Sequence, residues 1–193
     1  MLSKLSKLIM GILYVQPMNP YELIKIADMD VIQDWFPLTA PSIYTTIRNL
    51  EKKELITGEK IQEEKLPPKT VYSLTGKGEK ELVSELLKGL ESYTPEASDF
   101  GIALFHIRTL NREDALDYTK QRLDKLENLY QKAQKRLEEF NDKIPFNFRM
   151  MLTLNLYRLE TEVKLTRELI TEISGAENWN TSSAGFMEKV PEK

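Results

Sequence analysis

The sequence predicts a mostly α protein of the α+β class, in which helical regions flank a single β-hairpin. Three observations support this class. Apolar residues recur at helical spacing along most of the chain, as at Ile43, Ile47 and Leu50. The region 55–74 instead combines β-branched strand formers with two consecutive prolines, which are excluded from a ladder and mark a turn. After residue 100, apolar residues follow a heptad-like spacing that is typical of paired helices.

Two helices are expected first. Residues 3–15 carry an apolar stripe and end before Gln16 and Pro17. A turn over 17–20 leads into a second helix from Pro20 to about Ala27. Residues 28–38 hold more apolar and aromatic side chains than an ordinary loop. We expect a short helix or turn there that packs its aromatic residues inward.

A capped amphipathic helix follows, over about 40–53. Thr39 is the expected N-cap because its hydroxyl can accept a hydrogen bond from a free backbone N–H, and Pro41 suits the first turn. Ile43, Ile47 and Leu50 should face the core. The opposite face should carry side chains that can bond phosphates and base edges, namely Ser42, Thr45, Thr46, Arg48, Asn49, Lys52 and Lys53.

The hairpin and the next helix complete a recognisable order. Residues 55–61 and 70–74 should pair, with a tip over 65–69 where Lys65 and Lys69 flank the two prolines. Thr75 is the expected N-cap of a helix from about Gly76 to Ser92. Helices, hairpin and closing helix in this order are those of a winged helix-turn-helix domain, a class that usually binds duplex DNA.

Three motifs carry a resemblance to a known family. Tyr21-Glu22-Leu23, Ser42-Ile43-Tyr44 and Val71-Tyr72-Ser73-Leu74-Thr75 with Gly78 resemble the PadR-type transcriptional regulators over about residues 5–90. The resemblance implies a DNA-binding regulator. In the longer form of the family, it also implies a helical C-terminal region that makes a dimer.

The chain departs from the family pattern at three positions. Pro20 and Glu54 stand where the family has glycine, and Thr45 stands where it has proline. Tyr44 occupies a family position. It has two interpretations, a side chain that reaches a phosphate or a half-buried tyrosine that closes the helix against the hairpin.

The second half of the chain is expected to be helical. We predict a winged-helix domain over 1–92, a linker over 93–99, an all-α helical dimerisation domain over 100–174 and a mobile tail over 175–193. Within the helical domain, one apolar helix should span 100–110, a second should run from the N-cap Asn111 to Phe140, and a third should span 146–174.

The two long helices should not be able to bury their apolar stripes alone. They could pair antiparallel within one chain, exchange with a second subunit, or do both. The family resemblance favours contact with a second subunit. The candidate dimerisation residues are Leu152, Leu156, Leu159 and Val163.

Composition limits the chemistry. The 193 residues include no cysteine, so a disulfide, a thiolate metal site and a cysteine nucleophile are excluded. His106 is the single histidine and has no partner for catalysis or metal binding, so we predict no enzyme activity, no metal and no cofactor. The absence of cysteine fits a reducing compartment, so we expect a cytoplasmic protein. No apolar run reaches the length of about 18 residues needed to span a bilayer, so we expect no membrane partner.

The leading hypothesis is a dimeric, ligand-responsive repressor whose partners are double-stranded DNA, a second copy of itself and a small-molecule inducer. The expected DNA-binding residues are Ser42, Tyr44, Thr45, Thr46, Arg48, Asn49, Lys52, Lys53, Lys65 and Lys69. The candidate ligand-binding residues are Trp35, Phe36, Tyr93, Phe105 and His106, for which ordinary packing is the alternative.

The rival hypothesis is a winged-helix adaptor that binds proteins. Its support is charge, because residues 1–92 hold 12 Lys and Arg against 13 Asp and Glu, and many DNA-binding domains are more basic.

Overall fold

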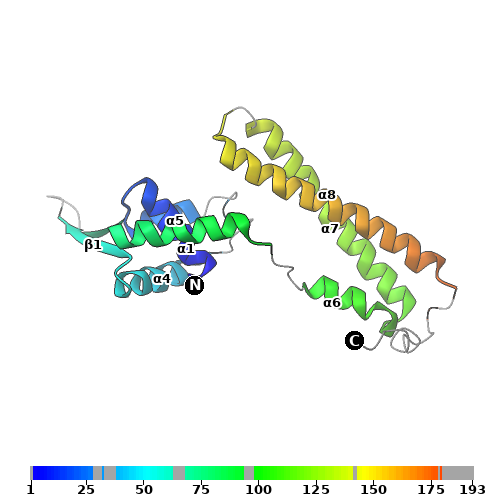
Figure 1. The fold of residues 1–193 in the computed structure, drawn as a ribbon. Helices are drawn as coiled ribbons and strands as arrows, with labels where there is room; N and C mark the ends of the chain where they lie inside the picture. Colours follow the sequence, from blue (N-terminus) through cyan, green and yellow to red (C-terminus); the bar gives the residue numbers. More distant parts are fainter. Residues whose placement is uncertain are drawn as a thin grey trace. The chain divides into compact units, whose positions relative to one another are not determined.

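The computed structural model describes residues 2–27, 32, 38–62, 68–93, 98–140, 143–177 and 179 (Figure 1). The chain divides into two compact units, Met1–Pro95 and Glu96–Lys193. The expected inward packing of Trp35 and Phe36 falls outside the described residues, as does the expected position of Lys65. Within the described residues, no helix is both long enough and apolar enough to cross a membrane.

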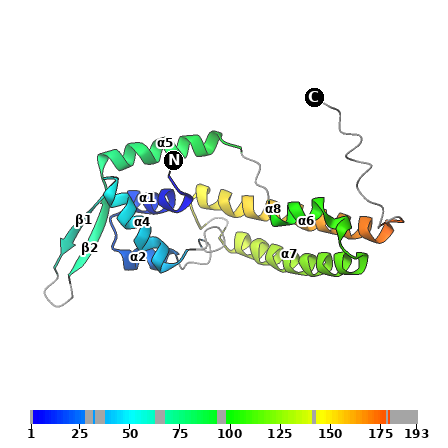
Figure 2. The same cartoon turned by 90° about the horizontal axis from the view of Figure 1, so that it is seen from below.

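The first unit is a helical cluster with one hairpin. Among the described residues, its bounded helices are α1 (Lys4–Val15), α2 (Pro20–Ala27), α4 (Ala40–Lys52) and α5 (Gly76–Glu91). Strands β1 (Ile56–Ile61) and β2 (Lys69–Leu74) pair antiparallel, with Ile56 opposite Leu74 and Ile61 opposite Lys69. Figures 1 and 2 both show the hairpin projecting away from the helices of this unit.

The core of the first unit forms where apolar faces of all these elements meet. Seven of its side chains are almost fully buried, namely Ile9, Met10, Leu23, Ile43, Ile47, Leu50 and Ile56. The helical periodicity predicts such inward faces for α1, α2 and α4. Burial of this apolar surface is the main term that stabilises the unit.

An additional backbone pairing ties the segment before α2 to the hairpin. The Met18 N–H donates to the Tyr72 carbonyl at 3.1 Å, and the Tyr72 N–H donates to the Met18 carbonyl at 2.8 Å. The sequence assigns 17–20 only to a turn, because the single bridge at Met18 has no alternating pattern of its own. The bridge covers part of one edge of β2.

A buried carboxylate joins α1 to α5. Glu85 is buried and lies 3.1 Å from the ammonium of Lys88 and 3.6 Å from that of Lys7 on α1. The hydrogen bond from Lys88 holds the pKa of Glu85 below its ordinary value. A buried charge is tolerated only with such partners, so this group fixes α5 against α1.

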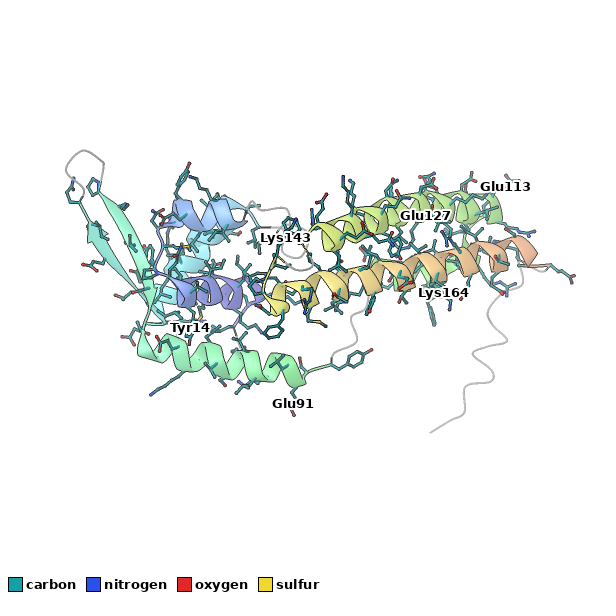
Figure 3. All side chains as sticks on the ribbon, turned by 90° about the horizontal axis from the view of Figure 1, so that it is seen from above. Tyr14, Glu91, Glu113, Glu127, Lys143 and Lys164 are labelled. Atoms are coloured by element: carbon teal, nitrogen blue, oxygen red, sulfur yellow. The ribbon has the colours of Figure 1, made fainter. Side chains whose placement is uncertain are left out.

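The second unit is built on two long helices. It contains α6 (Asp99–Phe105), the 3₁₀ turn η1 (Ile107–Thr109), α7 (Arg112–Phe140) and α8 (Phe146–Gly175). Helices α7 and α8 pack against each other as an antiparallel pair, which Figure 2 shows side by side. The intrachain pair is thus one of the arrangements that the sequence left open. Two cross-helix ion pairs flank it, Arg122–Glu162 at 2.5 Å and Arg167–Glu127 at 2.6 Å (Figure 3 labels Glu127).

The expectation of one helix over 100–110 is wrong. Helix α6 ends at Phe105, and His106 is followed by the 3₁₀ turn. The His106 carbonyl accepts hydrogen bonds from both the N–H and the hydroxyl of Thr109, each at 2.9 Å. In a continued α-helix, the His106 carbonyl would instead accept a hydrogen bond from the N–H four residues later. Bonding to the residue three positions later is the pattern of a 3₁₀ turn.

The end of α8 is closed by residues far away in the sequence. Arg112 at the start of α7 donates from Nε to the Ile173 carbonyl at 2.9 Å and from Nη2 to the Ser174 carbonyl. Trp179 is only 9% exposed, and its indole N–H donates to the Leu110 carbonyl at 2.8 Å. A mobile tail was expected over 175–193, but Trp179 within this range is packed and hydrogen-bonded.

Candidate nucleic-acid interface

Helix α4 begins at a position fixed by a reciprocal cap. The Thr39 hydroxyl accepts a hydrogen bond from the Ser42 N–H at 3.4 Å, and the Ser42 hydroxyl accepts one from the Thr39 N–H at 3.2 Å. Pro41 occupies the first turn, where its missing N–H costs nothing. The cap confirms the start of α4 that the sequence predicted. It also occupies the Ser42 hydroxyl, which makes Ser42 part of the helix start.

One face of α4 is exposed and polar. Because Ile43, Ile47 and Leu50 are buried against the core, the opposite face points away from it. Tyr44 is 44% exposed, so its ring is half-buried while part of it reaches solvent beside the polar face. The other exposed candidates on this helix and at its C-cap are Thr45, Arg48, Asn49, Lys52 and Lys53.

Thr46 is an exception to the sequence-based placement. It is 8% exposed, and its hydroxyl donates to the Ser42 carbonyl at 2.8 Å. The expectation that Thr46 lies on the polar face is therefore wrong. An analysis of apolar periodicity treats threonine as a polar residue. On a helix, however, its hydroxyl can donate to the carbonyl four residues earlier, and this allows the side chain to pack inward.

A Schellman turn ends α4. The Leu55 N–H donates to the Leu50 carbonyl at 3.0 Å, and the Glu54 N–H donates to the Glu51 carbonyl at 2.8 Å. Glu54 has a φ of 58°, in the left-handed region that favours glycine. Leu50 and Leu55, at the two ends of the turn, are both buried. Glu54 thus adopts the backbone shape that glycine supplies in the resembling family.

The first turn of α5 is attached to this exit of α4. The Thr75 hydroxyl accepts a hydrogen bond from the Gly78 N–H at 3.0 Å and donates to the Glu54 carbonyl at 2.8 Å. Lys77 Nζ donates to the Lys53 carbonyl at 2.8 Å. Gly78 is buried against the Leu55 carbonyl. Helix α4 is therefore held at its start by its own cap and at its end by α5.

The hairpin is attached to α4 through Tyr72. Burial raises the pKa of the Tyr72 phenol above its ordinary value, the charge of Glu51 adds to the rise, and that of Arg48 opposes it. A Cβ at Gly58 would meet the Tyr72 ring at 2.9 Å, so glycine lets β1 pack closely against this tyrosine. The base of the hairpin and the exposed face of α4 therefore form one continuous structure.

Lys69 differs slightly from its predicted position. The sequence places it in the tip, but it is the first residue of β2 and is partly buried. The two consecutive prolines indicate a tip without defining where the pairing resumes. The structure brings Lys69 and the exposed α4 residues into one unit.

A comparison with protein families matches the part of the chain that contains α4 and the hairpin. The family described as the transcriptional regulator PadR-like family matches residues 9–84, from α1 into α5. Residues 9–84 form a PadR-like domain. The match contains α4, both strands of the hairpin and the first half of α5, and it confirms the family resemblance of the motifs.

Solved structures match beyond the PadR-like domain. Bacillus subtilis PadR in complex with operator DNA is 21% identical, with a TM-score of 0.74 over 89% of this chain and 99% of that one. The same protein in complex with p-coumaric acid is 21% identical, with a TM-score of 0.70 over 88% and 98%. Smu.1604c from Streptococcus mutans UA159 is 26% identical, with a TM-score of 0.62 over 86% and 98%. The fold class, a winged helix followed by a helical region, is confirmed. No curated protein matches the chain.

The candidate residues beyond the PadR-like domain lie as follows. Leu152 and Val163 are buried, and Leu156 and Leu159 are partly buried, at the spacing that faces α7 of the same chain.

The described ligand candidates are exposed. Tyr93, just after α5, is 90% exposed, and Phe105 and His106 are exposed at the end of α6. The Phe105 and His106 rings pack edge to face, 4.9 Å apart. Tyr93 belongs to the first unit, whereas Phe105 and His106 belong to the second.

Proposed function

We propose that this protein is a sequence-specific DNA-binding transcriptional repressor that acts as a cytoplasmic homodimer and responds to a small molecule. The observation that carries the proposal is that both ends of α4 are held by hydrogen bonds. Its polar face is exposed while its two ends are fixed by the Thr39–Ser42 cap and by the contacts of Thr75 and Lys77. A preorganised helix with a polar outer face is what major-groove reading requires.

The side chains on that face suit base and phosphate contact. Arg48 can bond two acceptors of a guanine edge at once, and Asn49 can bond an adenine edge in the same way. Lys52 and Lys53 at the helix end suit the phosphate backbone. Glu51 offsets part of this positive charge, so we expect modest affinity for non-specific DNA. Lys65 and Lys69 of the hairpin are proposed to contact flanking phosphates.

The dimer is proposed to form through the second unit. After α7 has covered one face of α8, a second row of large apolar side chains remains exposed on it, comprising Phe146, Met150, Leu154, Tyr157 and Leu165. Their spacing of three, four or eight residues places them on one face of the helix. We propose that a second copy covers this row, while Leu152, Leu156, Leu159 and Val163 hold the α7–α8 pair that presents it. Two copies of α4 would then read half-sites about 34 Å apart.

The proposed ligand response has its support in the complex of Bacillus subtilis PadR with p-coumaric acid. A small molecule that changes the spacing of the two α4 helices would weaken DNA binding, because both half-sites must be contacted together. Thermal unfolding of the protein with and without p-coumaric acid tests whether this chain binds a ligand of that class. A lower DNA affinity in its presence would indicate an inducer.

A footprint on the DNA upstream of the protein's own gene tests the main proposal. We expect a protected region with two-fold symmetry and a binding constant that falls steeply with salt, since phosphate contacts release counterions. Uniform, weak binding along the DNA would instead favour the adaptor hypothesis, in which the winged domain binds proteins.

A further inference from the structure

Lys77 stands at a position where a cation is unfavourable for its own helix. It is the second residue of α5, and the positive end of a helix dipole repels a cation at that place. The side chain nevertheless points to the other end of another helix. Its ammonium donates to the Lys53 carbonyl, at the C-cap of α4, with a distance of 2.8 Å. A cation is favourable there, because the last carbonyls of a helix lack intrahelical donors.

The contact forms part of a group that holds the exit of α4. The neighbouring Glu54 carbonyl receives the Thr75 hydroxyl at 2.8 Å, and the next carbonyl, that of Leu55, receives the Thr75 N–H at 3.1 Å. Three successive carbonyls, those of Lys53, Glu54 and Leu55, are thus bonded by the first residues of α5 and its cap. These contacts hold the C-cap of α4 and the two residues that follow it.

The Glu54 carboxylate offers a second partner for Lys77, but a weaker one. Its Oε2 lies 3.5 Å from Lys77 Nζ, and both side chains are well exposed, at 62% for Lys77 and 83% for Glu54. An exposed ion pair of this kind contributes little. The shorter contact to the carbonyl is therefore the one that can hold α4.

We propose that Lys77 is a positioning residue for the DNA-reading helix α4. The inference rests on the proposed function. Lys77 acts by fixing the Lys53 carbonyl, and with it the orientation of Lys52 and Asn49 in the last turn, without touching DNA itself. The alternative is that Lys77 binds a phosphate directly, which is the ordinary role of an exposed lysine beside Lys52 and Lys53 in a DNA-binding surface.

The two roles differ in their salt dependence. A lysine that neutralises a phosphate contributes about one unit to the slope of log affinity against log salt, whereas a positioning lysine contributes none. The test uses the full-length protein with Lys77→Met, which keeps most of the side-chain volume. The DNA probe is a duplex enriched by the wild-type protein from a random library, compared with a duplex of scrambled sequence.

We expect Lys77→Met to weaken binding to the enriched duplex by about five- to tenfold. Binding to the scrambled duplex and both salt slopes should stay at the wild-type values. Lys77→Arg should recover most of the loss, because a guanidinium can also donate to a carbonyl. Glu54→Gln should leave affinity unchanged, and so should Lys80→Met, which removes an exposed lysine one turn further along α5.

A measurement without DNA separates this inference from the proposed function. The amides of Lys53, Glu54 and Leu55 bond to carbonyls within the end of α4, and their hydrogen exchange should be about five- to tenfold faster in Lys77→Met. Unchanged exchange would overturn the positioning role, as would equal losses on both duplexes with a slope lower by about one unit. If the wild-type protein enriched no sequence while exchange responded as expected, the proposed function would fail and Lys77 would only support the fold.

Discussion

Gly78 lies so close to the backbone carbonyl of Leu55 that a Cβ on Gly78 would overlap the carbonyl oxygen. The contact joins the first turn of α5 to the residue that follows the end of α4. Since the obstacle is backbone, a rotamer change cannot relieve it, and the two helices would have to move apart. The close packing that holds the exit of α4 therefore depends on a glycine.

We expect Gly78→Ala to destabilise the first unit by about 1–3 kcal/mol, the usual cost of forcing extra volume into a packed site. Urea unfolding followed by circular dichroism measures it. Gly89→Ala is the matched control, because it lies on the same helix and a Cβ added there would meet no atom within 4 Å. It should stabilise by up to about 1 kcal/mol through helix propensity. Equal effects of the two substitutions would contradict the close approach.

Glu54 gives a second prediction about the same turn. Its φ of 58° is unfavourable for a residue with a side chain, so Glu54→Gly should relieve strain at the end of α4. Glycine also increases the conformational entropy of the unfolded chain, and this offsets part of the gain. We therefore expect a net gain in unfolding free energy of about 0.5–1 kcal/mol. Differential scanning calorimetry would detect it as a higher Tm. The control Glu51→Gly, within α4, should lower the Tm instead.

The exposed face of α4 gives a prediction about binding. Arg48→Ala and Lys52→Ala should each weaken binding to a cognate duplex, the first by about 1–3 kcal/mol if Arg48 reads a base. Circular dichroism should show an unchanged fold, since both side chains are exposed. Thr46→Val, on the buried side of the same helix, should leave affinity largely unchanged in a gel-shift titration. Wild-type affinity in both exposed variants would exclude α4 as the reading element.

Trp179 gives a prediction about the second unit. It packs with Ala115 and Ile173 and donates its indole N–H to the Leu110 carbonyl at 2.8 Å. Trp179→Ala should cost about 3–5 kcal/mol of unfolding free energy, as for other large buried aromatics. Trp179→Phe keeps most of the apolar surface and should lose about 1 kcal/mol for the hydrogen bond. A negligible loss in Trp179→Ala, measured by urea unfolding, would show that the residue does not hold the end of the α7–α8 pair.

The elements that the sequence predicted well carry local signals. Helix α4 has an N-cap and a proline in its first turn, which predicted where the helix starts. The apolar spacing of Ile43, Ile47 and Leu50 predicted which of its faces is buried. The family motifs then indicated the hairpin and α5 around it. Local pattern and tertiary packing agree at these positions, which is why the candidate DNA-reading face could be anticipated.

The remaining features depend on contacts between distant residues. No local rule places Lys77 on the Lys53 carbonyl or Trp179 on Leu110, because each pair is separated by at least 24 residues. The inward position of Thr46 was missed because a hydroxyl can be satisfied within its own helix. The left-handed Glu54 could be suspected only from the family, where glycine stands at that place. Sequence patterns therefore predicted the elements, while the contacts that lock them required the structure.

The final prediction distinguishes the two faces of α8. Met150 and Leu154 belong to the exposed apolar row, whereas Val163 is buried. If a second copy covers the exposed row, the double substitution Met150→Asp and Leu154→Asp should give a monomer that keeps its helical content, because α7 still covers the inner face. Val163→Asp should instead unfold the second unit, since a carboxylate in the seam has no partner. Sedimentation velocity and circular dichroism measure both outcomes. A wild-type chain that sediments as a monomer at micromolar concentration would remove the proposed dimer, and with it the simultaneous reading of two half-sites.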